Sequence, residues 1–222
     1  MKTVAHRSVR PVTLFTAVLA IVACTLAAQP AASREAWQRP DDIVAALGLT
    51  LGSRVADVGA GDGFFTVRLA RAVGDSGRVL AIDLEPKMLE TLKQLAQKEK
   101  LPNVDVIQGD PNDPHLGPNS VDAVLIVHAY HEMREHGAML AHIRKALRPK
   151  GRLVIVEQIT EARRDEPREV QVKAHDLGPE YVVNELHAAG FRVERLDSNF
   201  TTNPATKDIN WIIVATPGTL FR

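Results

Sequence analysis

The sequence has almost no cysteine and no excess of charge of either sign. Cys24 is the only cysteine among 222 residues, which excludes an intramolecular disulfide and any zinc cluster built from cysteines. The 27 basic and 27 acidic residues cancel, so nothing favours a nucleic acid as a partner, because phosphate binding needs basic residues concentrated on one face. With 45% hydrophobic and 24% charged residues, the composition is typical of one globular domain and argues against disorder, a coiled coil or a polytopic membrane protein.

Charge is also missing from one long stretch near the N-terminus. Lys2, Arg7 and Arg10 precede this stretch, and none of the residues 11–33 is charged. A basic start followed by an apolar run and small residues is typical of a secretory signal. We therefore predict a signal peptide over residues 1–23, a linker over residues 24–36 and a folded domain over residues 37–222. Without the three basic residues of the signal, 24 basic residues face 27 acidic ones, a formal charge of −3.

The predicted signal ends in a short motif around the single cysteine. Ile21-Val22-Ala23-Cys24 resembles the bacterial lipoprotein box, in which the cysteine is lipidated. Two alternatives stay open: cleavage near Ala28 or Ala32, and an uncleaved anchor, since about 20 apolar residues span a bilayer. All three place the domain outside the cytoplasm, because the basic flank stays inside. We expect a periplasmic protein or one that is anchored to the membrane and faces the periplasm.

From about Trp37 onward, short β-branched runs alternate with helical patterns. Apolar stripes such as Met88, Leu92, Leu95 and Ala96, or Leu140, Ile143 and Leu147, mark the helices. Alternating strands and helices predict an α/β fold with a doubly wound, mostly parallel sheet covered on both faces. The predicted strands are Arg54–Val58, Arg78–Ile82, Val104–Gln108, Ala123–His128, Arg152–Glu157, Phe191–Leu196 and Ile209–Ala215, and the predicted helices are Asp41–Leu47, Phe64–Val73, Pro86–Lys100, Arg134–Arg148 and Pro179–Ala189.

The first predicted strand runs into a glycine-rich turn, Gly59-Ala60-Gly61-Asp62-Gly63, and then into a helix. Glycine allows the backbone to approach a ligand closely, and ligands of open α/β sheets bind beyond the carboxyl ends of the strands. The dinucleotide fingerprint needs Gly or Ala at its sixth position, where this chain has Phe64. NAD is therefore disfavoured as a cofactor. What remains is Asp-x-Gly-x-Gly-x-Gly, which starts at Asp57.

That pattern resembles motif I of the class I S-adenosylmethionine-dependent methyltransferases, and later landmarks follow in the order of that family. Asp83 ends the second strand, Gly109-Asp110 follows the third, Ser120–Val124 opens the fourth, and Leu147–Gly151 precedes the fifth. The resemblance covers about residues 37–215. It implies a seven-stranded, Rossmann-like sheet whose last strand is antiparallel, S-adenosylmethionine as the cofactor, and methyl transfer to a small-molecule acceptor by in-line displacement.

The resemblance also implies which residues bind the cofactor. The glycine loop would wrap its amino-acid end, the carboxylate of Asp83 would accept both ribose hydroxyls, and Asp110 would contact the adenine amino group. We expect Asp57 to orient the loop by accepting backbone N–H groups. Asp83 has an alternative role as a helix cap, and Asp113 is the substitute for Asp110. The cofactor-binding residues predicted in this way are Asp57, Gly59, Gly61, Gly63, Asp83 and Asp110.

Several histidines lie after the fourth predicted strand. His131 and His136 are five residues apart, about 140° around a helix, so they do not form the two-histidine motif of metalloproteases. A metal site built from His128 and His131 stays open, but we assign no metal. In the methyltransferase reading His131 is the candidate substrate contact or general base, and His128 is the second catalytic candidate. His175 and Tyr181 are expected near the same opening.

The acceptor itself is hardly constrained by the sequence. A lipophilic acceptor at a membrane would suit an anchored enzyme. S-adenosylmethionine is made in the cytoplasm, however, so an exported enzyme needs a supply of it. The alternative is an exported, non-catalytic binding module that keeps the fold.

Overall fold

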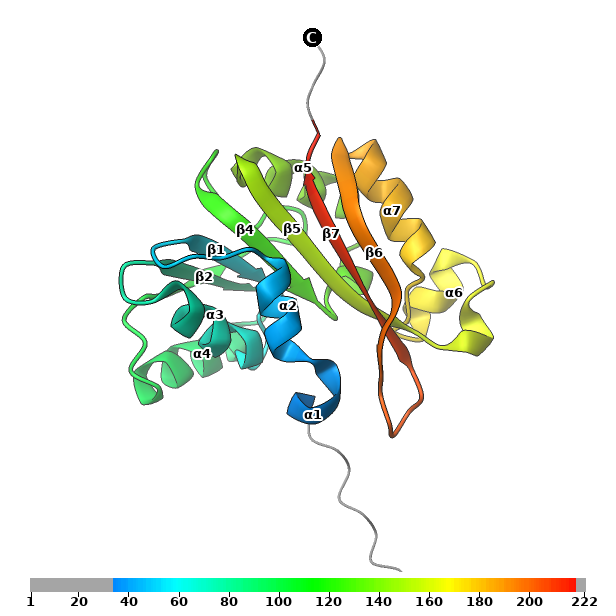
Figure 1. The fold of residues 1–222 in the computed structure, drawn as a ribbon, viewed down its shortest axis with the longest axis horizontal. Coiled ribbons are helices and arrows are strands. Elements are labelled where there is room, and N and C mark those ends of the chain that lie inside the picture. The colour runs from blue at the N-terminus through cyan, green and yellow to red at the C-terminus, as the bar shows by residue number, and fades with distance from the viewer. Residues whose placement is uncertain (1–33, 219–222) are drawn as a thin grey trace, which may run out of the picture. The chain divides into compact units, whose positions relative to one another are not determined.

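The computed structural model describes residues 34–218 and shows one seven-stranded sheet with helices on both faces (Figure 1). The signal predicted over residues 1–23, the cleavage sites near Ala28 and Ala32, and Cys24 lie outside the described residues. Among the residues from 34 to 218, no helix combines the length and the apolar character needed to cross a membrane.

The sheet has the strand order β3-β2-β1-β4-β5-β7-β6. Strand β7 runs antiparallel to both of its neighbours, and the remaining pairs are parallel. The predicted fold class is therefore confirmed. The strands are β1 (Arg54–Val58), β2 (Arg78–Asp83), β3 (Val104–Gln108), β4 (Val121–Val127), β5 (Leu147–Ile159), β6 (Phe191–Thr202) and β7 (Ile209–Pro217).

Two apolar cores lie on opposite faces of the sheet, because successive side chains of a strand point to opposite sides. Val55 belongs to the core shared with α2 and α3, whereas Ala56 belongs to the core shared with α5 and α7. Leu92 of α4 packs with Ala81 on the first of these faces. The helices are α2 (Pro40–Ala46), α3 (Phe64–Val73), α4 (Pro86–Lys98), α5 (His136–Ala146) and α7 (Pro179–Ala188).

The strand order reverses at β1, which pairs with β2 on one side and with β4 on the other. The loops after β1 and β4 therefore leave the sheet in different directions and open a crevice between them. In open α/β sheets this reversal is where ligands bind. The crevice holds four of the residues that the sequence predicts for the cofactor: Gly59, Gly61, Asp83 and Asp110.

Four short elements were not predicted. Helix α1 (Arg34–Gln38) begins inside the predicted linker, where the Arg34 guanidinium lies over the Phe64 ring, 4.2 Å from its centroid. The 3₁₀ turns η1 (Tyr130–Glu132) and η2 (Glu161–Arg163) and helix α6 (Arg168–Lys173) lie after β4 and β5. Elements of three to six residues are too short to show a hydrophobic period.

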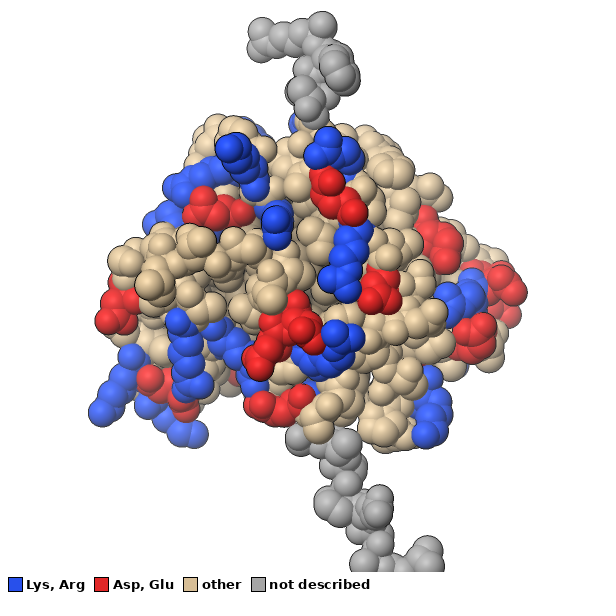
Figure 2. Space-filling model, in the orientation of Figure 1, with Lys and Arg blue, Asp and Glu red and all other residues tan. Residues whose placement is uncertain are grey.

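The longer helices agree with the predicted apolar stripes in part. Leu140 and Ile143 of α5 are buried as predicted. Leu147 is also buried, but it begins β5, so the helix predicted over Arg134–Arg148 extends too far at its C-terminal end. On α4 the buried pair is Leu89 and Leu92, while Met88 lines the cavity described below. On the face shown in Figure 2, basic and acidic residues are intermixed over the described part of the chain, in keeping with its balanced composition.

Candidate active site

The glycine loop after β1 has a backbone that only glycine adopts without strain. Gly59, Gly61 and Gly63 have φ angles of 75°, 54° and 80°, all left-handed. A Cβ on Gly59 would lie 2.4 Å from the Cβ of Ala129, and one on Gly63 would lie 2.4 Å from a Leu95 methyl group. A Cβ on Gly61 would meet nothing within 4 Å. Gly59 and Gly63 thus permit close packing, and Gly61 leaves open space for a ligand.

Asp83, at the end of β2, is hydrogen-bonded to this loop. Its Oδ2 accepts the Gly61 backbone N–H at 2.8 Å, and its Oδ1 accepts the Glu85 N–H at 3.0 Å. The second bond belongs to the turn that leads into α4, so the capping role is also present. Each carboxylate oxygen has a second lone pair. Asp83 is therefore fixed by the backbone and can still accept two hydrogen bonds from a ligand.

A cavity of about 340 Å³ lies beyond the carboxyl ends of β1, β2, β3 and β4, within the size range of small-molecule sites. It collects residues from four separate segments, including the predicted Gly59, Gly61, Asp83, Gly109, Asp110 and His128. Gly63 is not in its lining; it precedes α3 and packs against α4. The polar groups at one wall and the open space at Gly61 fit a nucleoside ligand with an extended polar tail.

Asp57 lies in β1 and is 3% exposed. Its Oδ2 accepts the hydroxyl of Thr66 from α3 at 2.6 Å, and burial raises the pKa of its carboxyl to about 6. We expected Asp57 to accept loop N–H groups, but the loop amide of Gly61 bonds to Asp83 instead. The difference arises because the Asp57 side chain meets the first turns of α3, which start directly after the loop.

The structure favours Asp110 over its substitute. Asp110 lines the cavity, and its Oδ2 lies 2.8 Å from Nε2 of His115. Asp113 accepts the His115 backbone N–H and is outside the cavity lining. A backbone bridge between Asp110 and Asp113 closes this turn. Asp110 is thus the acid beside the cavity at the end of β3.

His128 directly follows β4 and lines the cavity. Its backbone is left-handed, with φ 51°, and its Nε2 lies 2.7 Å from Oδ1 of Asn210 on β7. Burial lowers the pKa of the ring, which favours neutral imidazole. A neutral ring held through one nitrogen leaves the other nitrogen for a ligand or a proton.

His131 is held by a buried acid. Its backbone N–H and its Nδ1 lie 3.1 and 3.0 Å from the two oxygens of Glu157, which is fully buried on β5. Burial alone would lower the pKa of His131, but the hydrogen bond and the charge of Glu157 outweigh it and raise the pKa. His131 is outside the cavity lining, whereas the neighbouring Glu132 is part of it.

Of the two residues expected near the opening, His175 lies beside His131 but Tyr181 does not. Nδ1 of His175 lies 3.4 Å from Nε2 of His131, so these two rings meet as expected. The Tyr181 hydroxyl donates to the Glu166 carbonyl, away from the opening. His128 does not join the His131 cluster, because its ring turns to Asn210.

Sequence reasoning missed Glu157 and Asn210. Glu157 follows the buried run Leu153–Val156, and an unpaired carboxylate in such a strand is costly. A carboxylate at the end of so apolar a strand therefore indicated that Glu157 has a hydrogen-bonding partner. Asn210 carried no such signal, since only the pairing of β5 with β7 places it beside the end of β4.

Fold, motif order and comparison with known proteins agree on the class. Residues 55–151 match the family model described as a methyltransferase domain. A solved S-adenosylmethionine-dependent methyltransferase from Aquifex aeolicus superposes with a TM-score of 0.69 and 26% identity, over 83% of this chain and 92% of that one. The described part of the chain therefore has the fold of the class I S-adenosylmethionine-dependent methyltransferases, and S-adenosylmethionine is the methyl donor of that class.

The curated relatives that the chain matches include methyltransferases of quinone biosynthesis. A ubiquinone/menaquinone biosynthesis C-methyltransferase of Teredinibacter turnerae is 32% identical over 111 residues, 50% of this chain and 45% of the relative. A demethylmenaquinone methyltransferase of Staphylococcus aureus is 31% identical over the same shares. The match thus spans about half the length of these relatives. The [4+2]-cyclase SpnF has the same fold, with a TM-score of 0.70, 20% identity and coverage of 82% of this chain and 80% of that one.

Proposed function

We propose that this protein is an enzyme that transfers a methyl group from S-adenosylmethionine to a small-molecule acceptor. The observation that carries the proposal is the pairing of Asp83 with the Gly61 amide at the rim of the cavity. This contact holds a carboxylate and a glycine loop on the same wall. A nucleoside with hydroxyls and a polar tail matches both groups.

The chain supplies binding and orientation. In this proposal Asp83 accepts the ribose hydroxyls with its free lone pairs, Asp110 meets the adenine, and the loop at Gly61 passes along the amino-acid end. When bound, S-adenosylmethionine supplies an electrophilic methyl group attached to a sulfonium. The demand on the protein is in-line placement of the acceptor at near-contact distance. His128 lies on the cavity wall and is proposed to contact the acceptor.

The acceptor is proposed to be lipophilic and to carry a ring. Support comes from the printed names of two relatives, which refer to ubiquinone, menaquinone and demethylmenaquinone. The apolar cavity residues Met88, Met133 and Met139 agree with such an acceptor. Methionine adapts to flat or irregular apolar ligands because it is unbranched and polarizable.

We also propose that the domain acts outside the cytoplasm, in the periplasm or anchored to the membrane. The uncharged stretch after Arg10 and the motif at Cys24 support this location. Fractionation and lipid labelling of cells that carry Cys24→Ser test it. Wild-type protein is expected in the periplasmic or membrane fraction, and recovery in the cytoplasmic fraction would refute this location. If Cys24 is lipidated, Cys24→Ser loses the label and the membrane association, and unchanged labelling would exclude lipidation at this cysteine.

Calorimetry with S-adenosylmethionine and with its demethylated product tests the donor site. Wild-type protein is expected to bind both, and Asp83→Asn to bind both at least about tenfold more weakly, since hydrogen bonds to a charged group contribute about 1.5–3 kcal/mol. Asp75→Asn is the matched control, because Asp75 is an exposed acid in the turn before β2. Absence of binding to wild type would refute the proposed function.

Turnover separates the enzyme from the alternative of a non-catalytic module. The cyclase with the same fold shows that this architecture also serves other chemistry. Transfer of a labelled methyl group to a demethylated quinone analogue is expected for the wild type. Donor binding without transfer to quinone analogues or water-soluble phenols would favour the binding module.

A further inference from the structure

Three potential metal ligands meet beside the cavity, on segments that are far apart in the sequence. Nε2 of His131 lies 3.4 Å from Nδ1 of His175 and 3.8 Å from Oε1 of Glu132. One ligand atom from each residue lies within 4.8 Å of the others. The two histidine rings are perpendicular. Two nitrogens at about 2.0–2.1 Å from a tetrahedral zinc ion are about 3.3–3.4 Å apart, which matches the separation of His131 and His175.

The fully buried Glu157 orients the first of these ligands. Its Oε2 pairs with Nδ1 of His131 at 3.0 Å, which directs Nε2 of that ring toward His175. Metal-binding histidines typically bond their second nitrogen to a carboxylate in this way. The carboxylates of Glu157 and Glu132 both lie within 4 Å of the His131 ring, and adjacent carboxylates suit a divalent cation.

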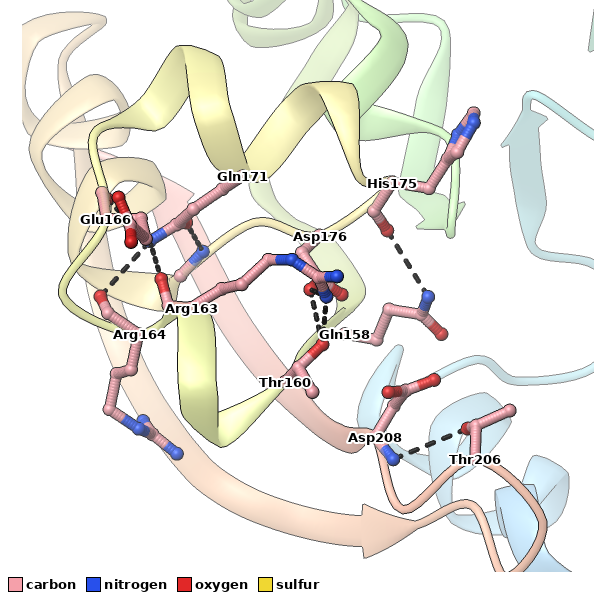
Figure 3. Close-up of polar contacts among 11 residues, drawn as sticks. Gln158, Thr160, Arg163, Arg164, Glu166, Gln171, His175, Asp176, Thr206 and Asp208 are labelled. Carbon is pink, nitrogen blue, oxygen red and sulfur yellow. Dashed lines mark hydrogen bonds and ion pairs between the residues drawn. The ribbon is translucent and has the colours of Figure 1, made fainter.

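His175 is held by the segment between β5 and α7 (Figure 3). The Gln158 side chain donates to the His175 carbonyl, and the next residue, Asp176, accepts from Thr160 and Arg163. Asp176 is 1% exposed. The His175 ring points away from this cluster in Figure 3. The network fixes the backbone of His175, and its ring meets the His131 ring.

We propose that His131, His175 and Glu132 form a binding site for a divalent transition metal of the zinc type, with one coordination position open. Two histidines and one carboxylate with an open fourth position are a known catalytic zinc set. Glu132 also lines the cavity, so a metal held by these three residues would lie beside it. It would supply a site for an acceptor hydroxyl or thiol; this last step rests on the proposed function.

This site changes the role predicted for His131. A nitrogen bound to metal cannot accept a proton, so Nε2 is a ligand and not a general base when the metal is present. A metal ion lowers the pKa of a bound hydroxyl. The acceptor then releases its proton to water without help from a side chain.

Titration of the metal-depleted full chain with Zn²⁺ and Co²⁺ tests the site. One equivalent is expected to bind, with the visible absorption of tetrahedral Co²⁺. His175→Ala, a change at an exposed side chain, is expected to lose stoichiometric binding, and Glu157→Gln to bind about 10- to 100-fold more weakly. His187→Ala is the control, because His187 is an exposed histidine on α7. No binding to wild type, unchanged binding in His175→Ala, or loss of binding in His187→Ala would overturn the site.

Two further readouts separate this site from the proposed function. S-adenosylmethionine binding to His175→Ala is expected to match wild type, since His175 is outside the cavity lining. Metal binding without donor binding would keep the metal site and refute the methyltransferase proposal; donor binding without metal would do the reverse. Thiophenol is expected to change the Co²⁺ spectrum of wild type. An unchanged spectrum would contradict the open position for a hydroxyl or thiol.

Discussion

Replacing Asp57 by asparagine is expected to stabilise the fold at neutral pH. The carboxyl of Asp57 is fully buried, and burial raises its pKa from 3.8 to about 6. At about 1.4 kcal/mol for each pKa unit, ionisation of this group in the folded state costs about 3 kcal/mol. Asparagine removes the charge, has nearly the same shape, and can still accept the hydrogen bond from Thr66.

The pH dependence follows from the direction of the pKa change. Below about pH 4 Asp57 is protonated in both the folded and the unfolded state, so wild type and Asp57→Asn are expected to have equal free energies of unfolding. Between about pH 4 and pH 6 the unfolded state releases this proton first, and the wild type loses stability. Above about pH 6 the difference is expected to level off at about 3 kcal/mol in favour of the variant.

Urea unfolding of both proteins at pH values from about 4 to 8 measures this difference. Subtracting the two curves cancels the contributions of other titrating groups. Asp75→Asn is the control, and its difference from wild type is expected to stay within about 0.5 kcal/mol at every pH. A difference between Asp57→Asn and wild type that does not change with pH across this range would show that folding does not raise the pKa of Asp57, and would refute the reasoning from burial.

Two further predictions concern packing. Gly59→Ala is expected to lower the free energy of unfolding in urea by about 3 kcal/mol or more, since its Cβ would lie 2.4 Å from the Cβ of Ala129. Gly61→Ala has no such clash, so it is expected to lose only about 1–2 kcal/mol of stability and to weaken donor binding in calorimetry. Equal losses of stability in the two variants would contradict this. Trp211→Phe is expected to cost about 1–3 kcal/mol by thermal unfolding, because the fully buried indole donates to the Leu177 carbonyl at 2.7 Å, and an unchanged melting temperature would argue against that bond.

Much of the fold could be read from the sequence because its signals are local. The predicted strand Arg54–Val58 and helix Phe64–Val73 have the observed bounds, since β-branched runs, apolar periods and glycine turns act within about ten residues. Asp83 was predicted at the site because the resemblance to class I methyltransferases implies a cofactor-binding carboxylate at the end of the second strand. The short helix α1 was missed because five residues carry no period.

Tertiary structure decided how the loops after β4, β5 and α6 meet. His131 and His175 are 44 positions apart, and His128 and Asn210 are 82 apart. Their contacts depend on the order of β4, β5 and β7 in the sheet, which no local pattern encodes. The sequence by itself therefore determined the class of fold and the glycine loop after the first strand. Only the packing of the strands brought His131, His175 and the buried Glu157 together. This packing also makes the burial of Glu157 possible, because a buried carboxylate needs a partner beside it.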